Sequence, residues 1–363
     1  MTFSKKICFI SAGLAGGGME RALTSLANHY SLTGHKVSII NLFQTEQFYD
    51  LDKNIQIIWP TIERSKYHRL VYAFAIIPYL RNSIKNIQPD LMISFGEWFN
   101  PYVILTTRFL NIPLFISDRM GPNMSIGPLL ETSRKLLYRF ADGIIAQTST
   151  AAEIIRNKTH ARNITVIPNP VKSIEADTSI KKNQIVTVGR LSREKGHIIL
   201  VKAFGRINQQ GWTLQIIGDG PERSAITKEI IELGLEDRIY LHGHLKNFGQ
   251  ILGESLIFVL PSFYEGFPNA LVEAMSVPLA CISSDCVAGP RDIIKNNENG
   301  ILVPPGDIDT LAKEMSRLIH DEALRLELTD NAMKVREKYK FEVVAAQYLA
   351  FMLSNTNLKY NNR

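Results

Sequence analysis

Short apolar runs alternate along the chain with longer segments in which apolar residues recur every three or four positions. The short runs are rich in β-branched residues and end at glycine, proline or polar residues, a pattern typical of buried strands. In the first half of the chain these predicted strands are KICFIS, KVSII, LMISF, LFIS and GIIAQ. In the second half they are QIVTVGR, TLQIIGDG, RIYLHG, SLIFVLPS, PLACISS and GILVPP.

The segments between the strands have helical spacing, as in MERALTSLANHYSLTG, where Gly34 stands at the position that favours glycine after a helix. Such alternation predicts parallel sheets with helices on both faces. The segment VIPNPVKS, residues 166–173, interrupts it because two prolines and an asparagine disfavour both helix and strand. We therefore predict two doubly wound α/β domains, residues 1–170 and 171–340.

Composition and charge narrow the class of protein. A chain of 363 residues with 45% hydrophobic and 21% charged residues is a globular protein large enough for two cores. Its three cysteines have neither disulfide nor metal-site spacing, and no apolar run reaches the length of about 18 residues that a membrane-spanning helix needs. The N-terminal segment fits a strand better than a signal peptide. We therefore expect a cytoplasmic protein. Residues 1–170 hold 18 Lys and Arg against 11 Asp and Glu, and residues 171–363 hold 23 against 24. The basic first half suggests an anionic partner, with ordinary scatter of charges as the alternative.

Several motifs follow predicted strands, where open parallel sheets bind their ligands. SAGLAGGGMER places Gly16 to Gly18 at the start of a helix, where backbone N–H groups can approach a phosphate, although a tight packing turn is the alternative. The loop lacks both the dinucleotide G-x-G-x-x-G and the P-loop lysine. VGRLSREKG carries cations suited to a diphosphate, or else is a solvated basic loop, and IIGDGPER is another turn at a strand end.

The stretch PSFYEGFPNALVEAM places Glu265 in a turn and Glu273 in the helix that follows. If Asn269 caps this helix, the N–H groups of residues 270–272 point toward a ligand at its N-terminus. A phosphate there, with one carboxylate for a ribose and another for a second polyol, describes a nucleotide sugar. The alternative is that Glu265 caps a turn and Glu273 favours the helix dipole.

With these motifs the chain resembles the retaining glycosyltransferases of family 4. The resemblance rests on Glu265-GFPNALV-Glu273, the GGG-x-E-R loop, IPNP, GRL-x-x-EKG, GDGP, the HG at 242–243 and NGILVPPGD, and it covers nearly the full length. It implies the GT-B fold, an α/β architecture of two facing Rossmann-like domains with an inter-domain cleft. In this fold residues 1–170 would bind the acceptor, residues 171–340 would bind the nucleotide sugar, and a helix at 341–363 would return to the first domain. It also implies transfer of a hexose or N-acetylhexosamine from a UDP-sugar, with retained anomeric configuration, in surface polysaccharide or lipid-linked oligosaccharide synthesis.

The resemblance further implies a role for each matching residue. Glu273 would bind the ribose, Glu265 would contact the donor sugar, and Arg190 and Lys195 would stabilise the departing diphosphate. The remaining donor-binding residues would be Phe267, Pro268, Asn269, Ala270 and Leu271, with Gly17 and Gly18 closing over the diphosphate from the first domain. Many relatives carry a histidine after the fifth strand; here FISDRMGP offers Asp118 and Arg119, which would face a sugar, a phosphate or the acceptor. Because arginine cannot act as a base at neutral pH, the identity of any general base stays open.

No metal or other cofactor is expected. Asp307-Ile308-Asp309 has the spacing of a metal-binding D-x-D but precedes a helix, where aspartate is an ordinary cap. Asp50-Leu51-Asp52 lies in a predicted loop with no other candidate ligands, and we expect no metal there either. The alternatives to a transferase are a nucleotide-sugar epimerase, a phosphorylase or a non-catalytic nucleotide-sugar-binding subunit. The expected partners are a UDP-sugar and a lipid-linked glycan acceptor, with no nucleic acid.

Residues 64–85, RSKYHRLVYAFAIIPYLRNSIK, join an apolar, aromatic centre to basic ends, and SRKLLYRF at 133–140 is similar. Such helices can rest at a membrane interface with their cations on anionic headgroups, or simply pack on the sheet. Because the resembling enzymes often use anionic polyprenyl-diphosphate acceptors, we expect a peripheral protein on the inner face of the cytoplasmic membrane.

Overall fold

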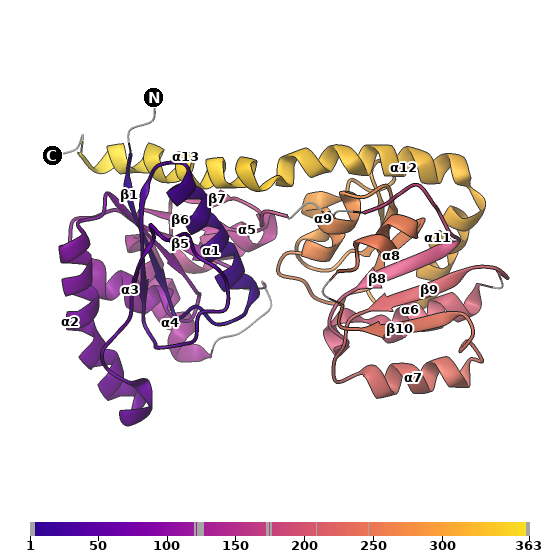
Figure 1. Ribbon diagram of the computed structural model, residues 1–363, viewed down its shortest axis with the longest axis horizontal. Helices are drawn as coiled ribbons and strands as arrows, with labels where there is room; N and C mark the ends of the chain where they lie inside the picture. The colour runs from indigo at the N-terminus through magenta and orange to yellow at the C-terminus, as the bar shows by residue number, and fades with distance from the viewer. Residues whose placement is uncertain are drawn as a thin grey trace. The chain divides into compact units, whose positions relative to one another are not determined.

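The computed structural model of the protein describes residues 4–119, 121, 127–171, 174, 176–207, 209–245 and 247–360, the last four by their backbone only (Figure 1). The chain forms two compact units. Unit 1 comprises Met1–Pro168 and Ala345–Arg363, and unit 2 comprises Asn169–Val344. Lys172 and Ser173 of the predicted VIPNPVKS break lie outside the described residues.

Unit 1 is built on a seven-stranded parallel sheet in the order β3-β2-β1-β4-β5-β6-β7. Its strands are β1 (Lys6–Ser11), β2 (Lys36–Asn41), β3 (Gln56–Ile58), β4 (Leu91–Phe95), β5 (Leu114–Asp118), β6 (Gly143–Ala146) and β7 (Ile164–Val166). Its helices are α1 (Gly18–Leu32), α2 (Arg69–Ile87), α3 (Asn100–Thr107), α4 (Pro128–Leu137), α5 (Ser149–Thr159) and the part of α13 (Phe341–Tyr360) from Ala345 onward, with short 3-10 turns η1 (Arg64–Lys66) and η2 (Tyr138–Phe140).

Unit 2 has a six-stranded parallel sheet in the order β10-β9-β8-β11-β12-β13. Its strands are β8 (Gln184–Val188), β9 (Thr213–Ile217), β10 (Ile239–Gly243), β11 (Ile257–Leu260), β12 (Ala280–Ser284) and β13 (Ile301–Val303). Its helical elements are η3 (Arg193–Lys195), α6 (His197–Arg206), α7 (Arg223–Glu232), α8 (Gly249–Glu254), α9 (Asn269–Met275), α10 (Pro290–Ile293), α11 (Ile308–His320), α12 (Glu322–Val335) and η4 (Arg336–Tyr339).

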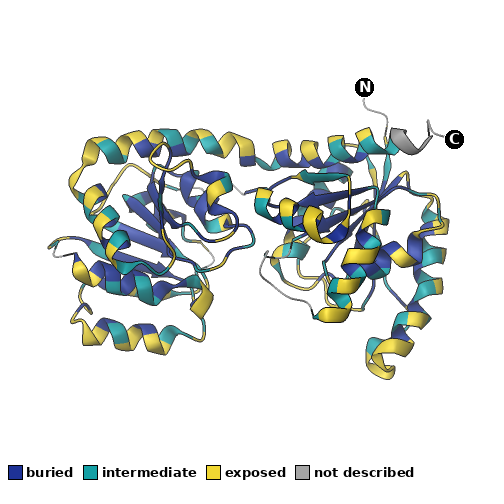
Figure 2. Ribbon diagram, turned by 180° about the vertical axis from the view of Figure 1, so that it is seen from behind, coloured by how far each residue is buried: buried dark blue, intermediate teal, exposed yellow. Residues whose placement is uncertain are grey.

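The predicted α/β fold class is confirmed, and every run predicted as a strand is one. The inner strands are mostly buried, and all five residues of β4 and of β5 are buried, because parallel sheets are covered on both faces (Figure 2). Sequence analysis missed β3 and β7, which are three residues long and pair at the two edges of the sheet. Gly34 follows the end of α1 with φ +92°, as its position predicted.

Residues of α13 complete the core of unit 1. The Tyr30 hydroxyl, on the buried face of α1, donates to the Ala345 carbonyl at 2.8 Å. Phe351 meets Phe115 of β5 edge to face, with ring centroids 5.7 Å apart. A Cβ at Gly143, at the start of β6, would lie 2.7 Å from the Phe351 ring, so only glycine lets the helix approach this strand. The sheet and the returning helix therefore form one packed body.

Helix α2 has one face in the core and one on the surface. Tyr72, Ile76, Leu80 and Ile84 recur every fourth residue and are buried. Leu70, Val71 and Phe74, on other faces, are exposed by 64%, 53% and 73% of their surface. The predicted apolar centre is thus divided between packing on the sheet and exposure to solvent. Among the described residues, no helix combines the length and the apolar character needed to cross a membrane.

Candidate functional site

The strand order of unit 2 marks where a ligand would bind. The sheet is wound in one direction from β8 through β9 to β10 and in the other from β11 to β13, so β8 and β11 are neighbours that flank a topological switch point. In open parallel sheets, ligands bind in the crevice outside the carboxyl ends of such strands. The turn after β8 contains Arg190 and Lys195, and the turn after β11 contains Glu265. The topology therefore collects these predicted site residues at one edge of the sheet.

The two turns pack directly against each other. The Phe263 N–H donates to the Glu194 carbonyl at 2.8 Å. Gly196 has φ +66°, and a Cβ there would lie 2.2 Å from the Pro261 carbonyl oxygen. Both its conformation and this close approach require glycine, so the EKG turn and the turn after β11 hold a fixed relative position.

Lys195 and Glu265, 70 positions apart in the chain, form an ion pair at the centre of this contact. The Lys195 Nζ lies 2.7 Å from Glu265 Oε1, and the Ser262 hydroxyl donates to the same oxygen at 2.7 Å. The Glu265 side chain is 5% exposed, whereas that of Lys195 is 26% exposed. Since both bonds fall on Oε1, Oε2 is the carboxylate oxygen that neither partner engages. Sequence analysis found the two residues but not their pairing.

The turn after β9 fixes the turn that carries Arg190. Gly218 has φ +141°, and a Cβ there would lie 1.9 Å from the Gly189 carbonyl oxygen. The Leu191 N–H donates to the Asp219 carbonyl at 3.0 Å. Arg190 is exposed at this strand end. The Ser192 hydroxyl, and to a lesser extent the charges of Lys195 and Arg190, lower the pKa of Glu194 in this turn, so the edge of the sheet keeps an ionised carboxylate among its cations.

Helix α9 begins differently from the prediction. Its N-cap is Pro268, and Asn269 is the first helical residue, so the expectation that Asn269 caps the helix is wrong. The Asn269 Oδ1 instead accepts from Asn169 Nδ2 at 3.1 Å. The Pro268 carbonyl accepts from the N–H groups of Leu271 and Val272 at 3.0 and 3.3 Å. These two N–H groups are therefore already bonded within the turn.

The other predicted donor-binding residues lie in the same region of unit 2. Phe267, Pro268 and Leu271 are buried, while Ala270 is half-buried. Phe267 packs against Tyr339 with ring centroids 5.9 Å apart. Glu273 is half-buried within α9. Next to the ion pair, burial and then the charge of Glu265 raise the pKa of the Cys286 thiol to about 12, so this cysteine stays protonated and unreactive.

Unit 1 has its own switch point, between β1 and β4. Gly17 is the N-cap of α1, and its carbonyl accepts from the Tyr49 hydroxyl at 3.1 Å. Gly18 opens the helix, is exposed, and has open space where a Cβ would stand. The glycine-rich loop thus presents bare backbone at the carboxyl edge of the sheet.

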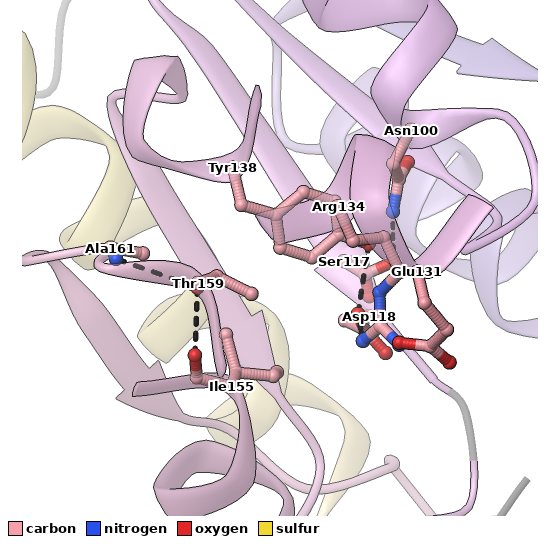
Figure 3. Close-up of polar contacts among 9 residues, drawn as sticks. All are labelled: Asn100, Ser117, Asp118, Glu131, Arg134, Tyr138, Ile155, Thr159 and Ala161. Atoms are coloured by element: carbon pink, nitrogen blue, oxygen red, sulfur yellow. Dashed lines mark hydrogen bonds and ion pairs between the residues drawn. The ribbon is translucent and has the colours of Figure 1, made fainter. Parts of the chain in front are cut away.

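Asp118, at the end of β5, lies inside a buried polar network (Figure 3). Its Oδ2 accepts from Arg134 Nη2 at 2.6 Å and from the Tyr138 hydroxyl at 2.9 Å. Burial and then the Asp118 charge raise the pKa of Tyr138 well above its ordinary value, so the phenol remains a donor. Asp118 is 3% and Arg134 5% exposed. Arg134 therefore serves this network and is not a surface cation of the SRKLLYRF segment, which sequence analysis did not foresee.

Arg119 follows Asp118 and is half-buried. Its guanidinium carbon lies 5.7 Å from the centroid of the Phe95 ring, and its Nη1 is 3.5 Å from the Tyr348 hydroxyl. It is thereby held beside the carboxyl ends of β4 and β5, the edge of the sheet at which the sequence placed it.

Asp307 and Asp52, one aspartate of each D-x-D pair, have structural partners. Asp307 is the N-cap of α11 and accepts from the Thr310 N–H at 3.0 Å, which confirms the predicted cap. Asp52 accepts from the Ser31 hydroxyl at 2.9 Å and from the Asn54 N–H at 3.0 Å. In the part of the chain that the structure describes, no three His, Cys, Asp or Glu residues are grouped as a metal site requires.

Comparison with known proteins identifies two family models in the chain. The model described as Glycosyltransferase Family 4 matches residues 16–173, and the one described as Glycosyl transferases group 1 matches residues 172–335. Together they span both units.

Curated relatives match nearly end to end. A GalNAc-alpha-(1->4)-GalNAc-alpha-(1->3)-diNAcBac-PP-undecaprenol alpha-1,4-N-acetyl-D-galactosaminyltransferase from Campylobacter jejuni is 28% identical over 97% of this chain and 99% of its own length. The amylovoran biosynthesis glycosyltransferase AmsD from Erwinia amylovora is 25% identical over 94% of this chain and 98% of its own.

Solved structures agree with these matches. The lipopolysaccharide outer core galactosyltransferase WaaB, in its apo form, superimposes with a TM-score of 0.80 at 25% identity over 96% of this chain and 99% of that one. Anabaena Alr3699/HepE in complex with UDP and glucose superimposes with a TM-score of 0.76 at 18% identity over 96% and 100%, a likeness of fold alone.

Proposed function

Since the chain belongs to the GT-B glycosyltransferases of family 4 and group 1, we propose that it moves a hexose or N-acetylhexosamine from a UDP-sugar to a polyprenyl-diphosphate-linked glycan, with retention of anomeric configuration. The product would be a bacterial surface polysaccharide or lipid-linked oligosaccharide.

The observation that carries the proposal is the meeting of Lys195 and Glu265 at the switch point of unit 2. Breaking a glycosidic bond to UDP leaves negative charge on the diphosphate, and fixed cations that face this charge lower the barrier. Lys195 has three N–H donors, and Glu265 holds it in place with one of them. In this proposal the remaining donors, with the exposed Arg190, meet the diphosphate, while Glu265 Oε2 meets a hydroxyl group of the donor sugar.

The remaining donor contacts follow the family pattern. Glu273 would accept hydrogen bonds from the ribose hydroxyls, and the backbone of residues 267–271 would line the sugar and phosphate. Gly17 and Gly18 would offer backbone N–H groups to the diphosphate. The name of the Campylobacter relative contains an undecaprenol-linked glycan, which supports a lipid-linked glycan acceptor, and the name of the Erwinia relative, which contains amylovoran biosynthesis, supports a role in glycan synthesis.

The surface of unit 1 supports a peripheral position at an anionic membrane. The exposed apolar side chains Leu70, Val71 and Phe74 of α2 lie close in sequence to the cations Lys66 and Arg69, both exposed. Apolar groups beside cations are the composition that binds the interface of anionic bilayers. This face would place unit 1 near a lipid-linked acceptor.

The test is a panel of UDP-sugars, with and without polyprenyl-diphosphate-linked glycans, in which UDP release and product formation are both followed. Acceptor-dependent UDP release with a new α-linked sugar, identified by its anomeric coupling in the NMR spectrum, is expected. Activity that survives a chelator would support the expectation of no metal. UDP-sugar interconversion without acceptor would favour an epimerase, and binding without turnover a non-catalytic subunit.

A further inference from the structure

Glu97, a carboxyl group at the switch point of unit 1, has no counterpart among the motifs found in the sequence. It follows Gly96, the residue directly after β4, which has φ +123°. This left-handed conformation favours glycine, and it turns the chain as soon as the strand ends. A Cβ at Gly96 would lie 3.6 Å from the Met19 sulfur in the first turn of α1. Glu97 therefore lies where the carboxyl ends of β1 and β4 adjoin, beside the glycine-rich loop.

The surroundings of Glu97 contain both signs of charge. Asp118, Arg134 and Arg119 act on its carboxyl group electrostatically. Burial, and after it the charge of Asp118, raise the pKa of Glu97, while its backbone hydrogen bond and the two arginines act in the opposite direction. Asp118 cannot compete for a ligand through Oδ2, because Arg134 and Tyr138 already occupy that oxygen.

One oxygen of Glu97 is buried without a partner. Within the described part of the chain, Oε2 is shielded from solvent and forms no hydrogen bond. In the neighbouring network Ser94 donates to Asn100 at 2.8 Å and Asn100 donates to the Ser117 carbonyl at 3.3 Å, whereas Arg134 Nε, like Glu97 Oε2, is buried without a partner among the described residues. A buried acceptor left without a donor destabilises the fold, so its retention indicates a donor from outside the chain.

The charges define the chemistry of that donor. A phosphate or carboxylate ligand would face Glu97 and Asp118, and an ammonium group would face Arg119 and Arg134. An uncharged hydroxyl group meets neither repulsion and supplies the O–H that Oε2 lacks. We propose that Glu97 accepts a hydrogen bond from a hydroxyl group of the acceptor glycan and is an acceptor-positioning residue of unit 1. This inference rests on the proposed function, because it takes unit 1 as the acceptor-binding unit.

The test replaces Glu97 with methionine, which keeps the length of the side chain and removes the acceptor. With undecaprenyl-diphosphate-linked GalNAc-GalNAc-diNAcBac as the probe and UDP-GalNAc as the donor, the acceptor KM of Glu97→Met should rise about tenfold or more, the loss typical of a hydrogen bond to a charged group. The UDP-sugar KM should change less than about twofold, and Tm should be equal or higher because a buried unpaired carboxyl is gone. Glu97→Gln, whose amide oxygen still accepts, should restore most of the acceptor affinity.

Glu131→Met is the matched control, because Glu131 also faces Arg134, at 3.6 Å, from the more exposed side. An equal rise of acceptor KM in this control would assign the effect to the electrostatic field and overturn the proposal. An unchanged acceptor KM in Glu97→Met would overturn it as well, as would a lower Tm with unchanged kinetics. If Glu97→Met does not fold, Glu97→Ala carries the same test. Absence of transfer by the wild-type enzyme from every UDP-sugar to every acceptor of the panel would instead count against the proposed function, and the inference would fall with it.

Discussion

Replacing Lys195 with methionine separates the structural role of this lysine from its catalytic role. The substitution keeps the length of the side chain but leaves Glu265, 5% exposed, with only the Ser262 hydroxyl as a partner. Removing one partner of a buried ion pair costs about 3–5 kcal/mol, whereas exposed pairs contribute about 0–1 kcal/mol. Because Lys195 is 26% exposed, water partly compensates, and we expect a loss of about 2 kcal/mol.

Unit 2 runs from Asn169 to Val344, a size at which each kcal/mol shifts Tm by about 2–4 °C. The Tm of its unfolding transition should therefore fall by about 4–8 °C in Lys195→Met. The double variant Lys195→Met/Glu265→Gln removes both charges and should recover most of that loss. Lys202→Met, which breaks the more exposed pair with Glu229, is the control and should shift Tm by less than about 3 °C.

Turnover should behave differently from stability. If Lys195 also faces the departing diphosphate, kcat should fall more than about tenfold in Lys195→Met and should not recover in the double variant. Calorimetry and the transferase assay on the same samples measure both quantities. A single variant as stable as the wild type, or a double variant no more stable than the single, would refute the energetic coupling. An unchanged kcat would remove Lys195 from the chemistry.

Three further predictions concern other residues. Glu273→Ala should weaken UDP binding in titration calorimetry, whereas Glu265→Ala should chiefly lower kcat, and equal loss of UDP affinity in both would contradict this division. Burial, and then the charge of Lys195, lower the pKa of His197 to about 4, so the unfolded chain takes up a proton between about pH 6.5 and 4 that the folded chain does not. Stability to urea should fall over that range by up to about 3 kcal/mol, and an equally steep fall in His197→Leu would contradict the assignment. Neutralising Arg64, Lys66 and Arg69 should weaken co-sedimentation with anionic vesicles, as should added salt, while Lys228→Gln on unit 2 should not; equal binding to neutral vesicles would exclude the membrane proposal.

The fold was predictable because strands buried on both faces are continuous apolar runs that stand out from amphipathic helices. The edge strand β3 could not be recognised in this way, because Gln56–Ile58 is short and only partly buried and therefore forms no continuous apolar run. Strand ends also located the turns that hold Arg190, Lys195 and Glu265, because parallel topology brings successive strand ends to one edge. For these residues, the local sequence pattern and the strand topology both indicate a position at the carboxyl edge of the sheet.

What the sequence did not yield depends on contacts between distant residues. Nothing in the sequence near Glu265 indicates that Lys195 neutralises its charge. The sequence likewise does not indicate that the Asn169 side chain donates a hydrogen bond to the Asn269 side chain. Arg134 looked like a surface cation in a basic segment, yet the buried Asp118 draws it into the core. No sequence motif includes Glu97, and it becomes a candidate site residue through its Oε2, which is buried without a hydrogen-bond partner among the described residues. Pairings of this kind follow from the folded geometry and are absent from local periodicity.

The return of the chain to unit 1 has a consequence for folding during synthesis. All strands of unit 1 leave the ribosome before any part of unit 2, but Tyr348 and Phe351, which pack against β5, emerge only after the whole of unit 2. Until then Phe115 and Tyr30 lack the helix that covers them. Unit 2 is a single continuous segment and can complete its core as it emerges. We therefore expect nascent chains arrested before residue 345 to contain a protease-resistant unit 2 and a protease-sensitive unit 1. Unit 1 should become protease-resistant only after the last helix has been synthesised.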